Sequence, residues 1–168
     1  MKRLFDNLLN VLSGFDNLLE KIERVVLVSI LTFVIGLSFF QVILRNFFAG
    51  GFTWGDVFLR HMVLWLGLIG ASIATKKNRH INIDIVSRIL HSKSKLIINT
   101  LIGLLSLYIC CILFRASINF ISAEKSFGST IFYDFPAWIF QIIFPVAFFI
   151  ISYRFALNVI NNLRDLLK

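Results

Sequence analysis

The sequence predicts an all-α membrane protein with four transmembrane helices, and three observations support this fold class. Hydrophobic residues make up 58% of the 168 residues, and the mean hydropathy is +0.83, whereas soluble domains contain about 45–50% apolar residues. Proline is scarce, with 2 copies. Four apolar runs approach the roughly 20 residues that a helix needs to cross a bilayer, where every backbone polar group must be satisfied internally.

The N-terminal segment, residues 1–24, has an amphipathic pattern. Its apolar residues recur at steps of three and four from Leu4 to Ile22, and polar residues fill the other face. This periodicity predicts a helix that lies in the membrane interface or against a partner, with Gly14 as a point where it could break. A signal peptide is not expected, because the following apolar run is too long for a signal-peptide apolar region and lacks an A-x-A cleavage site.

Four spans follow this segment, at about residues 25–44, 57–75, 96–114 and 136–157. The first contains no charged residue and is long enough to cover about 30 Å as a helix. The third could continue past Arg115. In the fourth, Pro136 suits a first-turn position, where no amide hydrogen bond is lost, whereas Pro145 lies mid-span and should kink the helix.

A second amphipathic piece lies between spans two and three. In "HINIDIVSRILHSKSK", residues 80–95, the apolar residues Ile85, Val86, Ile89 and Leu90 form one stripe. The pattern predicts a short cytoplasmic interfacial helix, with Asp84 near its start, where a carboxylate is favourable to the helix dipole. The non-spanning segments are too short for a soluble domain, so residues 1–168 are expected to form a single membrane domain.

The 17 lysines and arginines gather on alternate connections. Most lie in the N-terminal segment, in the loop after span two and at the C-terminal end, whereas the other side has only Arg45, Arg115 and Lys125. The positive-inside rule then places both termini in the cytoplasm. Because the basic residues follow the membrane topology, the net charge of +8 does not indicate nucleic-acid binding.

Arg60 and His61 interrupt the second span about one turn from its outer end. Arg60 can extend toward the lipid headgroups, and Asp56, four residues earlier, can pair with it. Arg45 is another candidate partner for Asp56. Two roles stay open for Arg60, namely anchoring or subunit contact, and a site for an ion or substrate. No Asp or Glu lies within the four predicted spans, so the deep carboxylate that usually couples transport to protons is missing.

The second span also carries small residues in two overlapping pairs, Gly67 with Ala71 and Gly70 with Ala74. Small residues four apart allow two membrane helices to approach closely. Trp65 lies deep in the same span, where it could pack at a subunit contact, against lipid or within the chain. Packing inside a four-helix unit and packing against a partner both fit these residues.

The stretch from about residue 39 to residue 86 carries motifs that are fairly specific when taken together. They are Arg45 at the end of span one, Trp54 followed by Asp56, Arg60, the Trp65-x-Gly67-x-x-Gly70-Ala71 run, and His80-Ile81-Asn82-Ile83-Asp84 after a basic patch. This set resembles the small membrane subunit of tripartite ATP-independent periplasmic (TRAP) transporters, the DctQ/SiaQ type. The sequence departs from that pattern at Gly55, where the family often has a polar residue, and in having one acid after Trp54 where two are common.

The resemblance implies a scaffold subunit of a sodium-coupled importer in a bacterial inner membrane. In such transporters a large membrane subunit carries the sodium and substrate sites and moves by an elevator-like motion, and a periplasmic binding protein delivers an organic acid, here sialic acid or a C4-dicarboxylate. The small subunit braces the large one as a heterodimer. No catalytic residue, metal site or cofactor is expected. The candidate residues for subunit contact or anchoring are Arg45, Trp54, Asp56, Arg60, Trp65, Gly67, Gly70, Ala71, Ala74, His80 and Asp84.

Two other classes of function were weighed against the scaffold. A self-sufficient small four-helix transporter acting as an oligomer would need a coupling group, for which Arg60 and His61 are the candidates. A membrane-embedded thiol oxidoreductase is disfavoured, because Cys110 and Cys111 are adjacent and do not form a C-x-x-C pair. Small buried apolar residues are the simpler interpretation of both cysteines.

Overall fold

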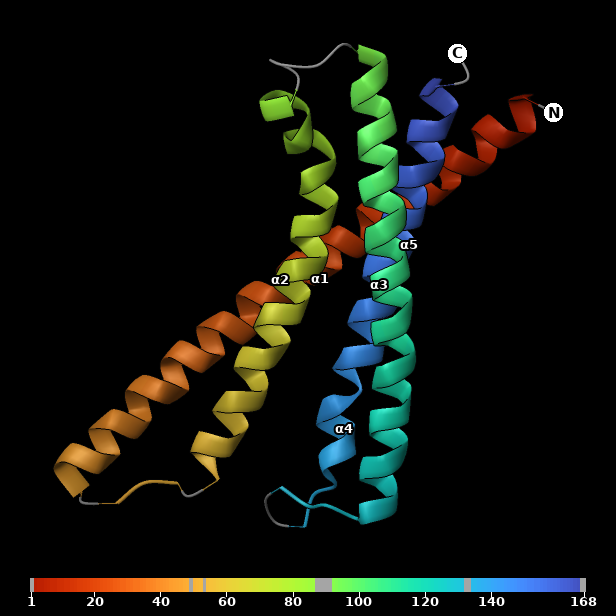
Figure 1. Cartoon of the computed structure of the whole chain (residues 1–168). Coiled ribbons are helices and arrows are strands. Elements are labelled where there is room, and N and C mark those ends of the chain that lie inside the picture. The colour runs from red at the N-terminus through yellow and green to blue at the C-terminus, as the bar shows by residue number, and fades with distance from the viewer. Residues whose placement is uncertain (1, 49, 53, 87–91, 132–133, 167–168) are drawn as a thin grey trace. The chain divides into compact units, whose positions relative to one another are not determined.

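The computed structural model describes residues 2–48, 50–52, 54–86, 92–131 and 134–166, and these ranges are almost entirely helical (Figure 1). Within them, four helical segments are long and apolar enough to cross a membrane: Val11–Phe47, Gly55–Lys77, Ile97–Phe127 and Ala137–Arg164. The predicted fold class, an all-α chain with four spanning helices, is confirmed. The chain divides into two compact units, residues 1–51 and 52–168.

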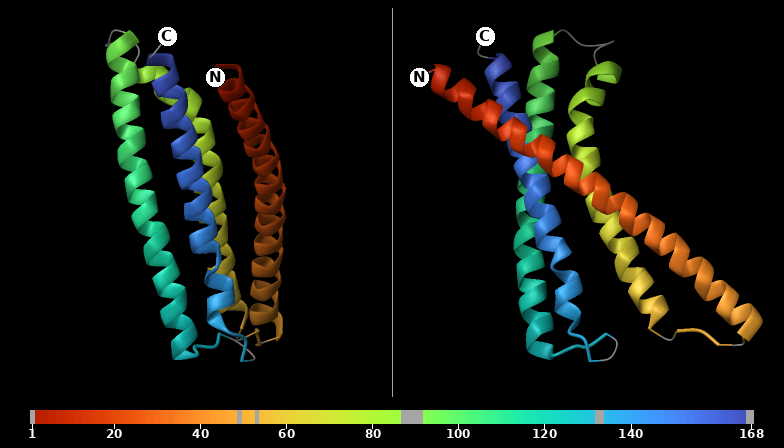
Figure 2. Two further views of the ribbon diagram at one scale, coloured as in Figure 1. Left: turned by 90° about the vertical axis from the view of Figure 1, so that its right-hand side faces the viewer. Right: turned by 180° about the vertical axis from the view of Figure 1, so that it is seen from behind.

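The first unit is one helix, α1 (Lys2–Phe48), of 47 residues, and both views in Figure 2 show it without interruption. At 1.5 Å per residue it is about 70 Å long. It passes through Gly14 unbroken, so residues 2–24 share a helix with the first span. A glycine inside a helix costs only about 1 kcal/mol relative to alanine, and no proline occurs before residue 136, so nothing in this sequence ends the helix at the predicted boundary.

The second unit contains α2 (Gly55–Val86), α3 (Ser92–Phe127), α4 (Ala137–Gln141) and α5 (Ile143–Leu166). α5 packs along α3 and also contacts α2 (Figure 1). The buried apolar residues of this unit are Met62, Ile69, Cys110, Ala137, Ala147, Ile151, Leu157 and Val159. Four of these eight residues belong to α5, more than to any other helix, so α5 is the central helix of this unit.

Two helices of this unit extend beyond the predicted spans. α2 continues past residue 75 to Val86, so the first half of the predicted cytoplasmic interfacial helix is the end of α2, and residues 87–91 lie outside the described ranges. α3 continues past Arg115 to Phe127. It ends where Gly128 adopts a φ of 65°, the left-handed conformation typical of a glycine just after a helix.

The fourth span is broken, as Pro145 predicted. α4 ends at Gln141, Ile142 lies between the two helices, and α5 begins at Ile143. The proline has no amide hydrogen to give to the carbonyl of Gln141, and its ring crowds that carbonyl, so the helix is interrupted directly after Gln141, at Ile142. Pro136 immediately precedes α4, with a φ of −63°.

A short hydrogen-bonded loop joins α3 to α4. The Ile131 amide donates to the Phe135 carbonyl and the Ala137 amide donates to the Ser129 carbonyl, each at 2.9 Å. Asp134 in this loop has a φ of 59°. The two hydrogen bonds fix the direction in which the chain enters α4.

Candidate functional site

Aromatic side chains gather at the end of the second unit where α2 and α4 begin. The Trp54 ring lies 5.3 Å from that of Phe52 and 6.2 Å from that of Phe58, measured between centroids. Phe58 in turn meets Phe140 of α4 at 6.1 Å in an edge-on arrangement, which is a favourable geometry for aromatic pairs. Trp54, predicted as a contact or anchoring residue, is therefore part of an aromatic cluster within its own chain.

His61 belongs to the same cluster. Its ring lies 5.7 Å from that of Phe140, and its Nδ1 is 2.8 Å from the Val57 carbonyl oxygen. A carbonyl oxygen can only accept, so Nδ1 carries the hydrogen in this contact. The contacts of His61 thus serve to order the start of α2.

Trp65 makes a long-range contact within the chain. Its indole Nε1 donates a hydrogen bond of 2.9 Å to the backbone carbonyl of Phe140. Phe140 precedes the break that Pro145 causes, and backbone polar groups near a break need partners from neighbouring helices when the segment crosses lipid. Of the three environments left open for Trp65, packing within the chain is therefore the one observed.

Arg60 and Asp56 are both exposed, and their pairing stays a prediction. Asp56 lies in the first turn of α2, where a carboxylate is favourable to the helix dipole. Arg45 belongs to the first unit, in which its Cγ atom lies 3.4 Å from the place of a Cβ on Gly51. A pairing of Arg45 with Asp56 joins residues of different units and stays a prediction.

The small-residue pairs of α2 are mostly exposed. Gly67, Ala71 and Ala74 are exposed and Gly70 is half-buried. A Cβ added to Gly67 would meet no atom within 4 Å. This face is therefore not where α2 packs against α5. His80 and Asp84 lie in α2, but their side chains are outside the described part of the structure.

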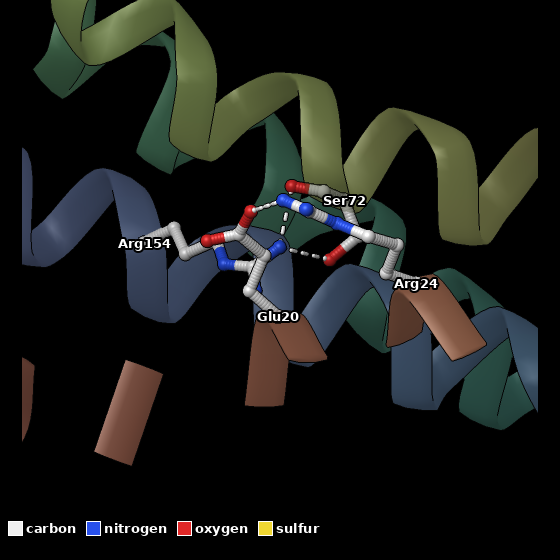
Figure 3. Close-up of polar contacts among 4 residues, drawn as sticks. All are labelled: Glu20, Arg24, Ser72 and Arg154. Atoms are coloured by element: carbon white, nitrogen blue, oxygen red, sulfur yellow. Dashed lines mark hydrogen bonds and ion pairs between the residues drawn. The ribbon is translucent and has the colours of Figure 1, made fainter. Parts of the chain in front are cut away.

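A buried arginine that the sequence analysis assigned to the C-terminal tail joins α5 to α2. Arg154 is only 1% exposed, and its Nη1 donates to the carbonyl and to the hydroxyl oxygen of Ser72, at 2.5 and 2.8 Å (Figure 3). A charge within the bounds of a predicted span was the signal that could have revealed it. Figure 3 also shows the ion pair between Glu20 and Arg24, one turn apart on α1.

α3 and α5 approach each other closely at Gly103. A Cβ added there would lie 2.9 Å from Cγ2 of Val159, which is closer than two carbon atoms pack. Gly103 thus acts as the small residue of a membrane helix contact. Cys110, on the same face of α3, is buried, Cys111 is exposed, and both are free thiols.

Comparison with known proteins shows the family. Residues 34–165 match the family model described as tripartite ATP-independent periplasmic transporters, DctQ component. The chain belongs to the DctQ family. This match covers most of the chain and includes all four spans in whole or in part, so the DctQ chain is a multi-pass membrane component of a TRAP transporter and not a member of an enzyme family.

Two relatives of this DctQ chain are known from Haemophilus influenzae. One, from strain 86-028NP, is named sialic acid TRAP transporter permease protein SiaT, and is 26% identical over 81 residues, 48% of this chain and 13% of its own length. The other, from strain ATCC 51907 / DSM 11121 / KW20 / Rd, is named as a TRAP transporter small permease protein, and is 27% identical over 103 residues, 61% of this chain and 63% of its own length. The chain therefore matches less than two thirds of either relative.

Proposed function

We propose that this DctQ chain is the scaffold subunit of a sodium-coupled importer of an organic acid in a bacterial inner membrane. It braces a large membrane subunit, which carries the sodium and substrate sites and moves by an elevator-like motion, while a periplasmic binding protein delivers the substrate. The observation that carries the proposal is the family match over residues 34–165, which include the last three membrane segments and part of the first.

The contacts inside the second unit support a bracing role. Trp65 fixes the broken fourth span through the Phe140 carbonyl, and Arg154 joins α5 to α2 through Ser72. These contacts come from separate helices, so they hold the helices of the unit in a fixed arrangement. A moving transport domain needs such a frame, because its displacement is defined only relative to a part that stays still in the lipid.

The site residues also support a role as a scaffold, with the transport site in the large subunit. Within the described residues, no three His, Cys, Asp or Glu side chains form a group that could hold a metal ion. His61 contacts the Val57 carbonyl and the Phe140 ring, so the candidate coupling group of a self-sufficient transporter has structural contacts. For Arg60, Gly67, Ala71 and Ala74, which are exposed on α2, we propose contact with the large subunit or anchoring in the lipid.

The substrate is proposed to be sialic acid. One relative has sialic acid in its name, and a C4-dicarboxylate is the alternative that the family resemblance suggests. This small subunit is not expected to select between them, since the substrate site belongs to the large subunit in this proposal.

Reconstitution into liposomes tests the proposal. The chain is co-purified with its large subunit, and uptake of labelled sialic acid or of a labelled C4-dicarboxylate is measured with an inward sodium gradient and added binding protein. Uptake should require both membrane subunits, the binding protein and sodium. Liposomes with the large subunit alone and with this chain alone are the matched controls, and sodium-driven uptake by this chain alone would refute the scaffold role.

A further inference from the structure

One face of α3 carries polar side chains along the segment that is apolar enough to cross the membrane. Tyr108, Arg115, Asn119 and Ser122 follow one another at intervals of seven, four and three residues, which places them on the same side of a helix. We call these four residues the polar stripe. All four are exposed, Tyr108 to 66%, and the structure records no hydrogen bond or ion pair between them and any residue that it describes.

The polar stripe faces away from α5. The buried residues Gly103, Cys110 and Ser117 recur every seven residues on the other side of α3, and Gly103 is the one that approaches Val159 of α5. At 100° per residue, Ser117 and Arg115 point in directions about 160° apart. The stripe is therefore not the side on which α3 packs in its own unit.

The depth of Arg115 follows from contacts between helix ends. Lys125 Nζ lies 5.5 Å from the centroid of the Trp138 ring at the start of α4, and His61, near the start of α2, packs against Phe140 of α4. The beginnings of α2 and α4 and the end of α3 are thus at one level, where Trp138 is suited to the membrane interface. Arg115 is ten residues before Lys125, about 15 Å along α3, which is half of the roughly 30 Å hydrocarbon core.

An exposed arginine near the middle of the bilayer is costly in lipid. Charged residues at such depth face other helices or a water-filled cavity and pair with polar groups there. The neighbouring amide and hydroxyl groups of the stripe also lack partners among the described residues, and polar side chains at this depth typically hydrogen-bond across a helix contact. These features favour protein over lipid as the surroundings of this face.

We propose that the polar stripe of α3 contacts the large membrane subunit, and that Arg115 there meets a carboxylate or a backbone carbonyl of that subunit inside the bilayer. This inference rests on the proposed function and adds to it the face of the chain at which the subunits meet. The occupant must supply acceptors for a guanidinium group and partners for an amide and two hydroxyl groups, which lipid tails do not have.

Photocrosslinking in the complete complex tests the location. The residue p-benzoylphenylalanine is introduced in place of Tyr108 or, as a matched control, in place of Phe149, which lies on α5, is 61% exposed, and contacts Phe114, the neighbour of Arg115. After illumination of membranes with both subunits, the adduct with the large subunit should be at least about tenfold more abundant for the position on α3. Equal yields, or adducts with lipid alone, would overturn the inference.

Charge substitution tests the role of Arg115. Arg115→Leu should lower recovery of the large subunit with the tagged small subunit about fivefold or more, Arg115→Lys should retain most of it, and Phe149→Leu should leave it unchanged. The amount of the small subunit in the membrane should stay equal or rise for Arg115→Leu, because leucine has a more favourable free energy of membrane insertion than arginine. Unchanged recovery with Arg115→Leu would overturn the inference.

The wild-type chain separates this inference from the proposed function. If it co-purifies with the large subunit but crosslinks through a different face, the scaffold role stands and the assignment of the polar stripe fails. If the wild-type chain does not associate with the large subunit at all, both proposals fail.

Discussion

Replacing Gly103 by alanine tests the close contact between α3 and α5. The added Cβ would lie 2.9 Å from Cγ2 of Val159, whereas a Cβ added to Gly67 would meet no atom within 4 Å. Both changes occur inside helices, where alanine is favoured over glycine by about 1 kcal/mol. Because this gain is common to the two variants, the difference between their free energies of unfolding gives the cost of crowding at the α3–α5 contact.

The expected stability difference follows from comparing Gly103→Ala with Gly67→Ala. Overpacking a tight contact costs about 1–3 kcal/mol. Gly67→Ala should therefore stabilise the isolated protein by up to about 1 kcal/mol, and Gly103→Ala should range from neutral to about 2 kcal/mol destabilised. The two unfolding equilibrium constants should differ by a factor of about 5 to 150, since each 1.4 kcal/mol corresponds to a factor of ten.

Unfolding in detergent provides the measurement. The purified protein in dodecylmaltoside is titrated with sodium dodecyl sulfate, and tryptophan fluorescence follows the transition. A third variant combines Gly103→Ala with Val159→Ala, which removes the crowding methyl group. Its free energy of unfolding should be about 1–2 kcal/mol higher than the value obtained by adding the effects of the two single substitutions. If Gly103→Ala stabilises the protein as much as Gly67→Ala does, the close approach does not exist and the reasoning is wrong.

Three further predictions use related measurements. Trp65→Phe keeps the apolar ring but loses the indole hydrogen bond, and should lower stability in the same titration by about 0.6–1.7 kcal/mol; no change would show that this bond contributes nothing. Ser72→Ala should be mild, because the backbone carbonyl still accepts from Arg154, whereas Arg154→Met removes both hydrogen bonds and should cost more; the reverse order would contradict this. In a variant without native cysteines, a cysteine replacing Lys125 should react with an impermeant maleimide in intact spheroplasts and one replacing Lys76 should not, as the positive-inside rule requires; the opposite labelling would invert the topology.

The sequence predicted the features that depend on local pattern. Apolar runs of membrane length indicated the four spans, and the missing amide hydrogen of Pro145 indicated the break in the last one, which falls at Ile142. These predictions succeed because backbone hydrogen bonding in lipid leaves the chain few alternatives. Helix ends were less predictable, since the third span was placed at about residues 96–114, with continuation past Arg115 left open, and α3 extends to Phe127.

The contacts between helices could not be read from the sequence. Trp65 and Arg154 find backbone carbonyls as partners, and every residue has a carbonyl, so sequence alone does not single out the acceptor. The tight helix contact lies at Gly103, although the glycines of α2 had the more conspicuous spacing. Spacing shows which residues share a face, but which face meets a neighbour depends on the arrangement of the helices.

The uninterrupted course of α1 has a mechanical consequence. Its apolar part, Val11–Phe47, has 37 residues and is about 55 Å long. Even at a tilt of about 40°, the upper end of the usual range, it would extend about 42 Å along the membrane normal, more than the hydrocarbon thickness of about 30 Å. Because the helix is continuous, a change in the tilt of the first span should also reorient its N-terminal part. A spectroscopic probe near Val11 would therefore report the tilt angle of the first span.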